Sequence, residues 1–113
     1  MIYPGRAEHP AHELARRQMT GVFSGMVSFA IDGGVAAARQ VCAGTRVFAL
    51  ATSLGGIESL IFPPTAWLHT DPALLAQIAD SPWAQHPGLI RLSVGIEDSR
   101  DLIADLDRTL MLG

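Results

Sequence analysis

The 113-residue sequence predicts an α+β fold, a two-layer sandwich of about four mainly antiparallel strands with helices on one face. Short runs in which apolar residues alternate with other residues indicate strands, and GLIRLSVGIED, residues 88–98, is the clearest of them. Segments typical of helices lie between these runs. Because a chain of this length has room for one core, we expect residues 1–113 to form a single domain.

Four segments are predicted to be helical, in the order helix, strand, helix, strand, strand, helix, strand, helix. They are residues 9–19, 34–44, 70–80 and 97–113. Thr70 or Asp71 is the expected N-cap of the third helix, and Asp98 or Ser99 that of the last. The last helix is amphipathic, so we expect Leu102, Ile103, Leu106 and Leu110 to pack inward and its aspartates to face solvent.

Four segments are predicted to be strands, and the first three are residues 25–32, 46–53 and 57–62. The third ends at Pro63 and Pro64, because proline cannot continue a central strand. The short connection between the second and third strands predicts that these two strands pair antiparallel.

The last predicted strand carries an arginine, Arg91, on the face opposite its apolar residues. Its packed face consists of Ile90, Leu92, Val94 and Ile96. The opposite face carries Arg91, Ser93 and Gly95, which we expect to leave space for a small ligand. The pattern alone favours a surface or interface arginine paired with a carboxylate. A carboxylate clamp is the alternative, because a guanidinium binds a carboxylate through two parallel hydrogen bonds.

Composition narrows the classes of partner and compartment. A net charge of −3 predicts no nucleic-acid partner, and no apolar stretch is long enough to predict a membrane span. Charged residues are only 17% of the chain, which suggests that part of the surface meets another protein. We expect no signal peptide, and the single cysteine, Cys42, fits a small core residue in a reducing, cytoplasmic setting.

Other motifs give weaker signals. His9 and His12 share a helix face but lack a third metal ligand, so no metal site is expected, and His69 and His86 are expected at the surface. The SLGG turn that begins at Ser53 is not a phosphate loop, because no lysine and no helix follow it. Ser53 also lacks the Gly-x-Ser-x-Gly setting of a hydrolase nucleophile.

Three blocks together are more specific than any of these motifs. They are YPGRAEHPAHELARRQMTGVFSGMVSF at residues 3–29, VFALATSLGGIESLI at 47–61 and LIRLSVGIEDSRDLIADLDRTL at 89–110. In order and spacing they resemble the C-terminal part of the Cys/Met-metabolism PLP enzymes, which include the cystathionine γ-synthases, γ-lyases and β-lyases. The resemblance implies the small C-terminal domain of a fold-type I enzyme, packed against a larger cofactor domain.

The resemblance also implies roles for individual residues. Arg91 matches the family arginine that binds the α-carboxylate of the amino-acid substrate, and Ser53 matches a serine that lines the same site. Leu54 to Gly56 match the loop that shapes the pocket. Thr52 stands where γ-synthases and γ-lyases often carry glutamate, so the subtype stays open.

Further departures concern the cofactor and two short segments. PPTAWLH, residues 63–69, stands where the family has an HPASMTH segment, and Ser24 stands in a stretch where glycine is usual. Enzymes of this family hold PLP through a lysine, and all eight basic residues of this chain are arginines. We therefore expect no covalent cofactor on this chain, no activity from it alone, and a partner chain or domain that carries PLP. A homo-oligomer, a non-catalytic binding module and a truncated remnant remain open.

Overall fold

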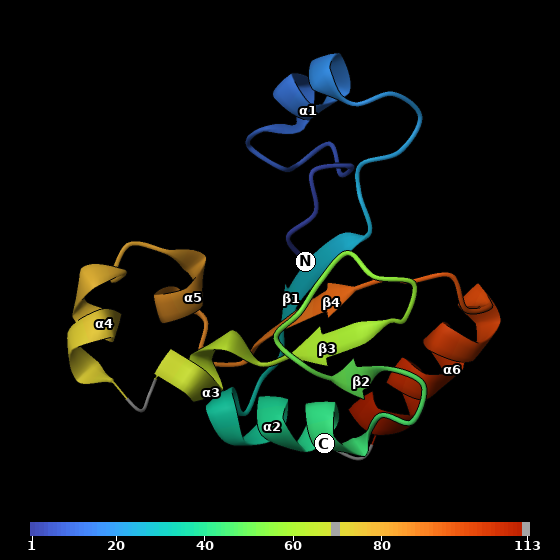
Figure 1. Cartoon of the computed structure of the whole chain (residues 1–113). Helices are drawn as coiled ribbons and strands as arrows, with labels where there is room; N and C mark the ends of the chain where they lie inside the picture. The colour runs from blue at the N-terminus through green and yellow to red at the C-terminus, as the bar shows by residue number, and fades with distance from the viewer. Residues whose placement is uncertain (69–70, 112–113) are drawn as a thin grey trace.

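The structure is a computed structural model, and it describes residues 1–68 and 71–111. Its helices are α1 (His12–Gln18), α2 (Gly34–Gly44), α3 (Pro64–Leu68), α4 (Pro72–Gln77), α5 (Pro82–Gln85) and α6 (Ser99–Leu110). Its strands are β1 (Met26–Ala30), β2 (Ala49–Leu50), β3 (Leu60–Phe62) and β4 (Leu89–Ser93). The fold is α+β, with a four-stranded sheet over which α2 and α6 pack (Figure 1).

The strands lie in the order β1-β4-β3-β2, and β4 is antiparallel to both of its neighbours. The predicted antiparallel pairing of the second and third strands is wrong, because β2 and β3 are parallel. Residues 51–59, of which 52–58 are exposed, carry the chain back along the sheet, so that β3 begins at the same end as β2. Such a crossover is what parallel neighbours require, although here it contains no helix.

The apolar face of the sheet forms the core with α2 and α6. It includes Val27 of β1, Ile61 of β3 and both Ile90 and Leu92 of β4. The predicted inward positions of Ile90 and Leu92 are confirmed, since their exposed fractions are 0% and 5%. The buried partners from the helix layer are Ala38, Val41, Cys42 and Leu102. The prediction that Cys42 is a small core residue is confirmed as well.

The alternation in the last strand ends earlier than the sequence indicates. β4 stops at Ser93, and Val94 and Ile96 are 38% and 80% exposed, so their predicted place on the packed face is wrong. The predicted space for a ligand beside Ser93 is also absent, because Ser93 is buried. At Gly95 the backbone of Ile57 crosses so closely that a Cβ atom would collide with its carbonyl oxygen.

Helices are present in all four segments where they were predicted, but the bounds of three of them differ from the predicted ones. Asp98 caps α6 by accepting from the backbone N–H of Arg100, and Asp71 caps α4, as predicted. Thr70 and His69 lie outside the described residues. The short helices α3 and α5 were not predicted from the sequence, and α1 begins at His12 rather than near Pro10.

Asp105 contradicts the prediction that the aspartates of the last helix face solvent. It is 4% exposed, and its carboxylate accepts hydrogen bonds from the backbone N–H groups of Arg46, Val47 and Phe48 at 2.8–3.1 Å. Arg108 donates to the same carboxylate at 2.8 Å. Asp105 therefore ties the middle of α6 to the segment that leads into β2.

Residues 3–25 project from the sheet and carry α1 with them (Figure 1). The segment is closed on itself by His12, whose Nδ1 lies 2.7 Å from the carbonyl oxygen of Pro4 and whose ring stacks on Phe23. Ser24 has φ of +78°, a left-handed conformation that favours glycine, so its side chain is accommodated there at a conformational cost.

Candidate functional site

Arg91 lies on the sheet face opposite the apolar core, in the middle of β4. Its cross-strand neighbours are Ser28 of β1 and Phe62 of β3. The Phe62 ring supports the guanidinium, whose carbon lies 5.3 Å from the ring centroid, a cation–π distance. The sheet therefore fixes the base of this side chain and an aromatic ring supports its charged end.

The guanidinium points to the exposed loop that follows β2. Its Nη2 donates to the carbonyl oxygens of Thr52 at 2.8 Å and Ser53 at 3.0 Å. Its Nε is buried and has no hydrogen-bond partner among residues 1–68 and 71–111. The fold thus brings Arg91 together with Thr52 and Ser53, which are almost forty positions earlier in the chain.

A second contact from β4 holds the same loop. The Ser93 hydroxyl oxygen accepts a hydrogen bond from the backbone N–H of Gly55 at 2.8 Å. Gly55 has φ of +76°, so the loop turns here in a conformation that favours glycine. Arg91 and Ser93 are on the same face of β4 because side chains alternate along a strand. β4 therefore grips the loop at two points.

The far end of the loop is held by Glu97. Its carboxylate accepts from the backbone N–H of Ser59 at 2.9 Å and from the Ser59 hydroxyl at 2.7 Å. The same hydroxyl oxygen accepts from the N–H of Gly95 at 2.8 Å. The hydrogen bonds that Glu97 accepts, first from the Ser59 backbone and then from the Ser59 hydroxyl, lower the pKa of Glu97 below its usual value.

The remaining predicted site residues present their side chains outward. Ser53 and Thr52 are exposed, and the loop touches Arg91 through their carbonyl oxygens rather than their hydroxyls. Leu54 is 56% exposed. The site is therefore open at the loop, where Thr52 and Ser53 lie at the surface of the chain.

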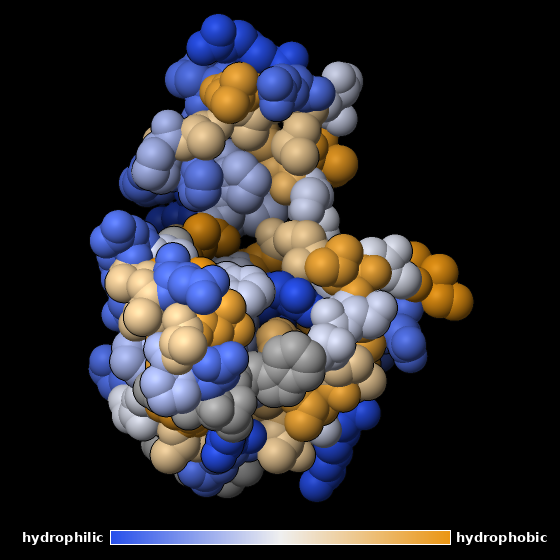
Figure 2. All heavy atoms as spheres, turned by 60° about the vertical axis from the view of Figure 1, so that its left-hand side comes forward, coloured by the Kyte–Doolittle hydropathy of each residue, from blue (hydrophilic) through white to orange (hydrophobic). Residues whose placement is uncertain are grey.

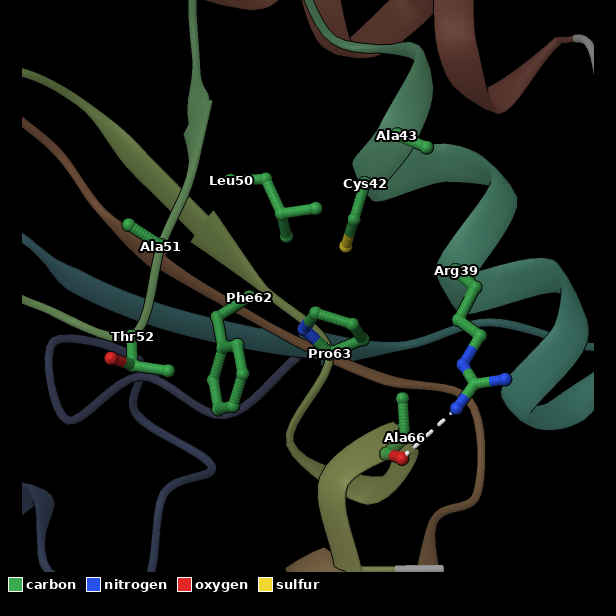
Figure 3. A pocket seen from close by; sticks show the side chains of 9 residues that line it. All are labelled: Arg39, Cys42, Ala43, Leu50, Ala51, Thr52, Phe62, Pro63 and Ala66. Atoms are coloured by element: carbon green, nitrogen blue, oxygen red, sulfur yellow. Dashed lines mark hydrogen bonds between the residues drawn. The ribbon is translucent and has the colours of Figure 1, made fainter.

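Sequence reasoning missed a cavity next to this site. It has a volume of about 460 Å³ and lies between α2, α3 and the ends of β2 and β3 (Figure 3). Its lining comprises Arg39, Cys42, Ala43, Leu50, Ala51, Thr52, Phe62, Pro63 and Ala66. Phe62 and Thr52 are shared between this cavity and the contacts of Arg91. Phe62 lies beside Arg91 because β3 pairs with β4, and local sequence patterns do not reveal this pairing.

The donor set does not fit a covalent PLP site. The chain contains no lysine, so none of its side chains offers the amine that holds this cofactor. Among the described residues no cluster of three or more His, Cys, Asp or Glu side chains is arranged to hold a metal ion. His9 accepts from the N–H of Ala11, and His86 is exposed, as predicted. Burial raises the pKa of Cys42 to about 12, so this thiol is a poor nucleophile.

Large apolar side chains are exposed around the loop and on the projecting N-terminal segment. The most exposed of them are Val22, Leu50, Leu54, Ile57 and Ile96. Figure 2 shows hydrophobic side chains reaching the surface among hydrophilic ones. None of the helices within the described ranges is long and apolar enough to cross a membrane.

Comparison with known proteins decides the family. The family model described as "Cys/Met metabolism PLP-dependent enzyme" matches residues 1–111. This chain belongs to that family. Cystathionine gamma-synthase of Mycobacterium tuberculosis is 51% identical over 110 residues, which are 97% of this chain and 26% of the relative. Cystathionine gamma-lyase of Mus musculus is 44% identical over 97% of this chain and 27% of its own length.

Solved structures of the family agree with this result. Cystathionine gamma synthase from Xanthomonas oryzae pv. oryzae, in complex with aminoacrylate and cysteine, matches with a TM-score of 0.80 and 46% identity. The match covers 96% of this chain and 27% of that protein. The metB structure from Corynebacterium glutamicum gives a TM-score of 0.75 at 40% identity. This PLP-family chain therefore corresponds to about a quarter of the enzymes it matches.

Proposed function

We propose that this chain is the substrate-binding C-terminal domain of a PLP-dependent transsulfuration enzyme of the cystathionine γ-synthase or γ-lyase type. The observation that carries the proposal is the meeting of Arg91 with the Thr52–Ser53 loop, made by two hydrogen bonds from one guanidinium nitrogen. The family match and the relatives named above support the reaction class.

In this proposal Arg91 binds the α-carboxylate of the amino-acid substrate. Its Nη2 is engaged by the loop, while Nε lacks a partner among the described residues. A buried donor without an acceptor costs free energy, so a rotation of the Arg91 side chain that brings Nε to a bound carboxylate is favoured. The Phe62 ring lies against the guanidinium and in this proposal helps to hold it in place for the bound carboxylate. Ser53, Thr52 and Leu54 form the exposed rim of the same site.

The cofactor and the lysine belong to another part of the enzyme in this proposal. PLP, when bound there, stabilises the carbanion that forms beside the amino group, and this chain's part is to orient the substrate. The exposed apolar residues around the loop are the surface that meets this large PLP-binding domain or chain. We further propose a cytoplasmic enzyme, in line with the single, unpaired cysteine of this chain.

A chimera tests the proposal. Residues 1–111 of this chain would replace the matching quarter of the M. tuberculosis enzyme. With residue Arg91 intact, we expect bound cofactor, visible by its absorbance, and γ-replacement activity. Arg91→Ala should then lower kcat/KM roughly 10- to 150-fold, chiefly through KM, because a hydrogen-bonded charge pair contributes about 1.5–3 kcal/mol. Arg6→Ala, at an exposed arginine paired with Glu8, is the control.

The result also separates the alternatives. A chimera that binds the cofactor and is equally active with Arg91→Ala would contradict the carboxylate role. A chimera that folds without binding cofactor or turning over substrate favours a non-catalytic binding module. Self-association of this chain together with failure of the chimera to fold favours a truncated remnant with an exposed former interface.

A further inference from the structure

The loop that meets Arg91 has little apolar packing of its own. Leu54 is 56% exposed and Ile57 is 74% exposed, and both lie in the coil between β2 and β3. The position of such a loop depends on its polar contacts, because burial of its side chains contributes little to holding it. Those contacts come from β4 and from the turn that follows β4.

Ser93 makes the contact at the centre of the loop. Its side chain is 2% exposed, and its hydroxyl oxygen accepts from the N–H of Gly55 at 2.8 Å. The Glu97 and Ser59 contacts lie at the end of the loop, close to β3. Between the end of β2 and Ile57, Arg91 and Ser93 provide the side-chain contacts that the described residues show.

The orientation of Arg91 depends on the loop as much as the loop depends on Arg91. Nη2 of Arg91 donates to the carbonyl oxygens of Thr52 and Ser53, and Ser53 lies only two positions before Gly55 in the chain. If the Gly55 anchor is released, these carbonyl oxygens are free to move relative to β4. The guanidinium then keeps its Phe62 contact but loses the acceptors that set its rotation.

We propose that Ser93 is a positioning residue that orients the Arg91 guanidinium by anchoring Gly55. The proposal rests on the proposed function for its link to substrate, but its structural half is testable without any ligand. Ser93 does not touch the substrate in this proposal and acts only through the loop.

The test uses four forms of the full 113-residue chain, which are wild type, Ser93→Ala, Ser93→Thr and Ser28→Ala. Ser93→Thr retains the hydroxyl acceptor. Ser28 pairs with Arg91 from the other neighbouring strand and is the matched control. Three quantities are measured by NMR: hydrogen exchange of the Gly55 amide, the chemical shift of the Arg91 Nε–H group, and the affinity for L-methionine as the probe.

In Ser93→Ala we expect faster exchange at Gly55, a shifted or broadened Arg91 Nε–H signal, and L-methionine affinity about 2- to 10-fold weaker, as for loss of one hydrogen bond. Ser93→Thr should restore all three, and Ser28→Ala should resemble wild type. If Ser93→Ala fails to fold, Ser93→Cys takes its place, because sulfur is a weaker acceptor in a similar volume.

The outcomes separate this inference from the proposed function. Unchanged Gly55 exchange and an unchanged Arg91 signal in a folded Ser93→Ala or Ser93→Cys variant would overturn the inference. If these signals change as expected while wild type does not bind L-methionine, the anchoring role stands and the carboxylate role of Arg91 fails. A Ser28→Ala variant with the same effects as Ser93→Ala would also overturn the inference, because a general disturbance of the strand would then explain both.

Discussion

The two faces of β4 are held by different physical means. On one face Ile90 and Leu92 pack into an apolar core with α2 and α6. On the other face Arg91 and Ser93 hold an exposed loop through hydrogen bonds. Full burial of a large apolar side chain contributes about 1.5–3 kcal/mol at each core position, whereas a net hydrogen bond between neutral groups, such as that of Ser93 with Gly55, contributes about 1 kcal/mol. We therefore expect the core face to determine stability and the loop face to determine recognition.

The largest effect on stability is expected from removal of the buried carboxylate of Asp105. Asp105→Ala removes the acceptor of three backbone N–H groups and of Arg108. Loss of one partner of a buried charged network should cost about 3–5 kcal/mol of unfolding free energy, measured by urea denaturation. Asp107→Ala, at an exposed position of the same helix, should change it by less than about 0.5 kcal/mol. Equal effects for both variants would contradict this account.

The pH dependence of stability follows from the same carboxylate. Burial raises the pKa of Asp105, but the backbone hydrogen bonds from Arg46, Phe48 and Val47 and the contact from Arg108 outweigh it, so the pKa is lowered. A lowered pKa in the folded state stabilises the fold above the unfolded pKa of about 4, and this stability is lost as the pH falls through the folded value. In Asp105→Asn the loss of unfolding free energy below about pH 4 should therefore be smaller than in wild type. If the unfolding free energy of Asp105→Asn fell at low pH as steeply as that of wild type, the assignment of this pH dependence to Asp105 would be contradicted.

Shortening an apolar core side chain should have the next largest effect. Ile61 is fully buried in the middle of the sheet, so Ile61→Ala should cost about 2–5 kcal/mol of unfolding free energy. The prediction that Ile103 packs inward is wrong, because its side chain is 59% exposed. Ile103→Ala is therefore the matched control and should cost much less. If Ile61→Ala altered the Gly55 amide exchange before global unfolding, the division between the two faces would be wrong.

A smaller, local effect is expected at the far end of the loop. The hydrogen bonds from Ser59 lower the pKa of Glu97. The stability that Glu97 contributes to the fold is therefore present above the usual glutamate pKa and is lost as the pH falls through the lowered pKa. The NMR shift of the Ser59 amide should therefore titrate with a midpoint below the ordinary value of about 4.3. In Glu97→Gln that titration should vanish, and its persistence would assign the shift to another group.

The smallest effect concerns Cys42, beside the cavity of Figure 3. Because burial raises the pKa of its thiol to about 12, native protein at pH 8 should react with a thiol reagent far more slowly than protein in denaturant. Rapid labelling of the native chain would mean that the cavity opens to the α2 side.

The sequence allowed prediction of features that local patterns encode. Alternation placed Ile90 and Leu92 on the core face, and the short polar residues Asp71 and Asp98 marked the starts of two helices. Alternation could not show that β4 ends at Ser93, because Val94 and Ile96 continue the period after the strand has turned away.

Features that depend on distant pairing were out of reach. The burial of Asp105 requires residues 46–48, almost sixty positions away, and the parallel pairing of β2 with β3 depends on a coil with no periodicity. For the site, the pattern alone favoured a surface or interface role for Arg91 with a carboxylate clamp as the alternative, and the family resemblance reversed that order. Phe62 entered the site through strand order, which no local pattern specifies.

The central claim is that Arg91 binds the carboxylate of an amino acid. NMR titration of the full chain with L-methionine and with L-methioninamide, which lacks the carboxylate, tests it most directly. We expect L-methionine to shift the Arg91 Nε–H signal, L-methioninamide to have little effect, and Arg91→Gln to abolish the difference between the two ligands. Equal responses to both ligands, or an unchanged preference for L-methionine in folded Arg91→Gln, would contradict the claim.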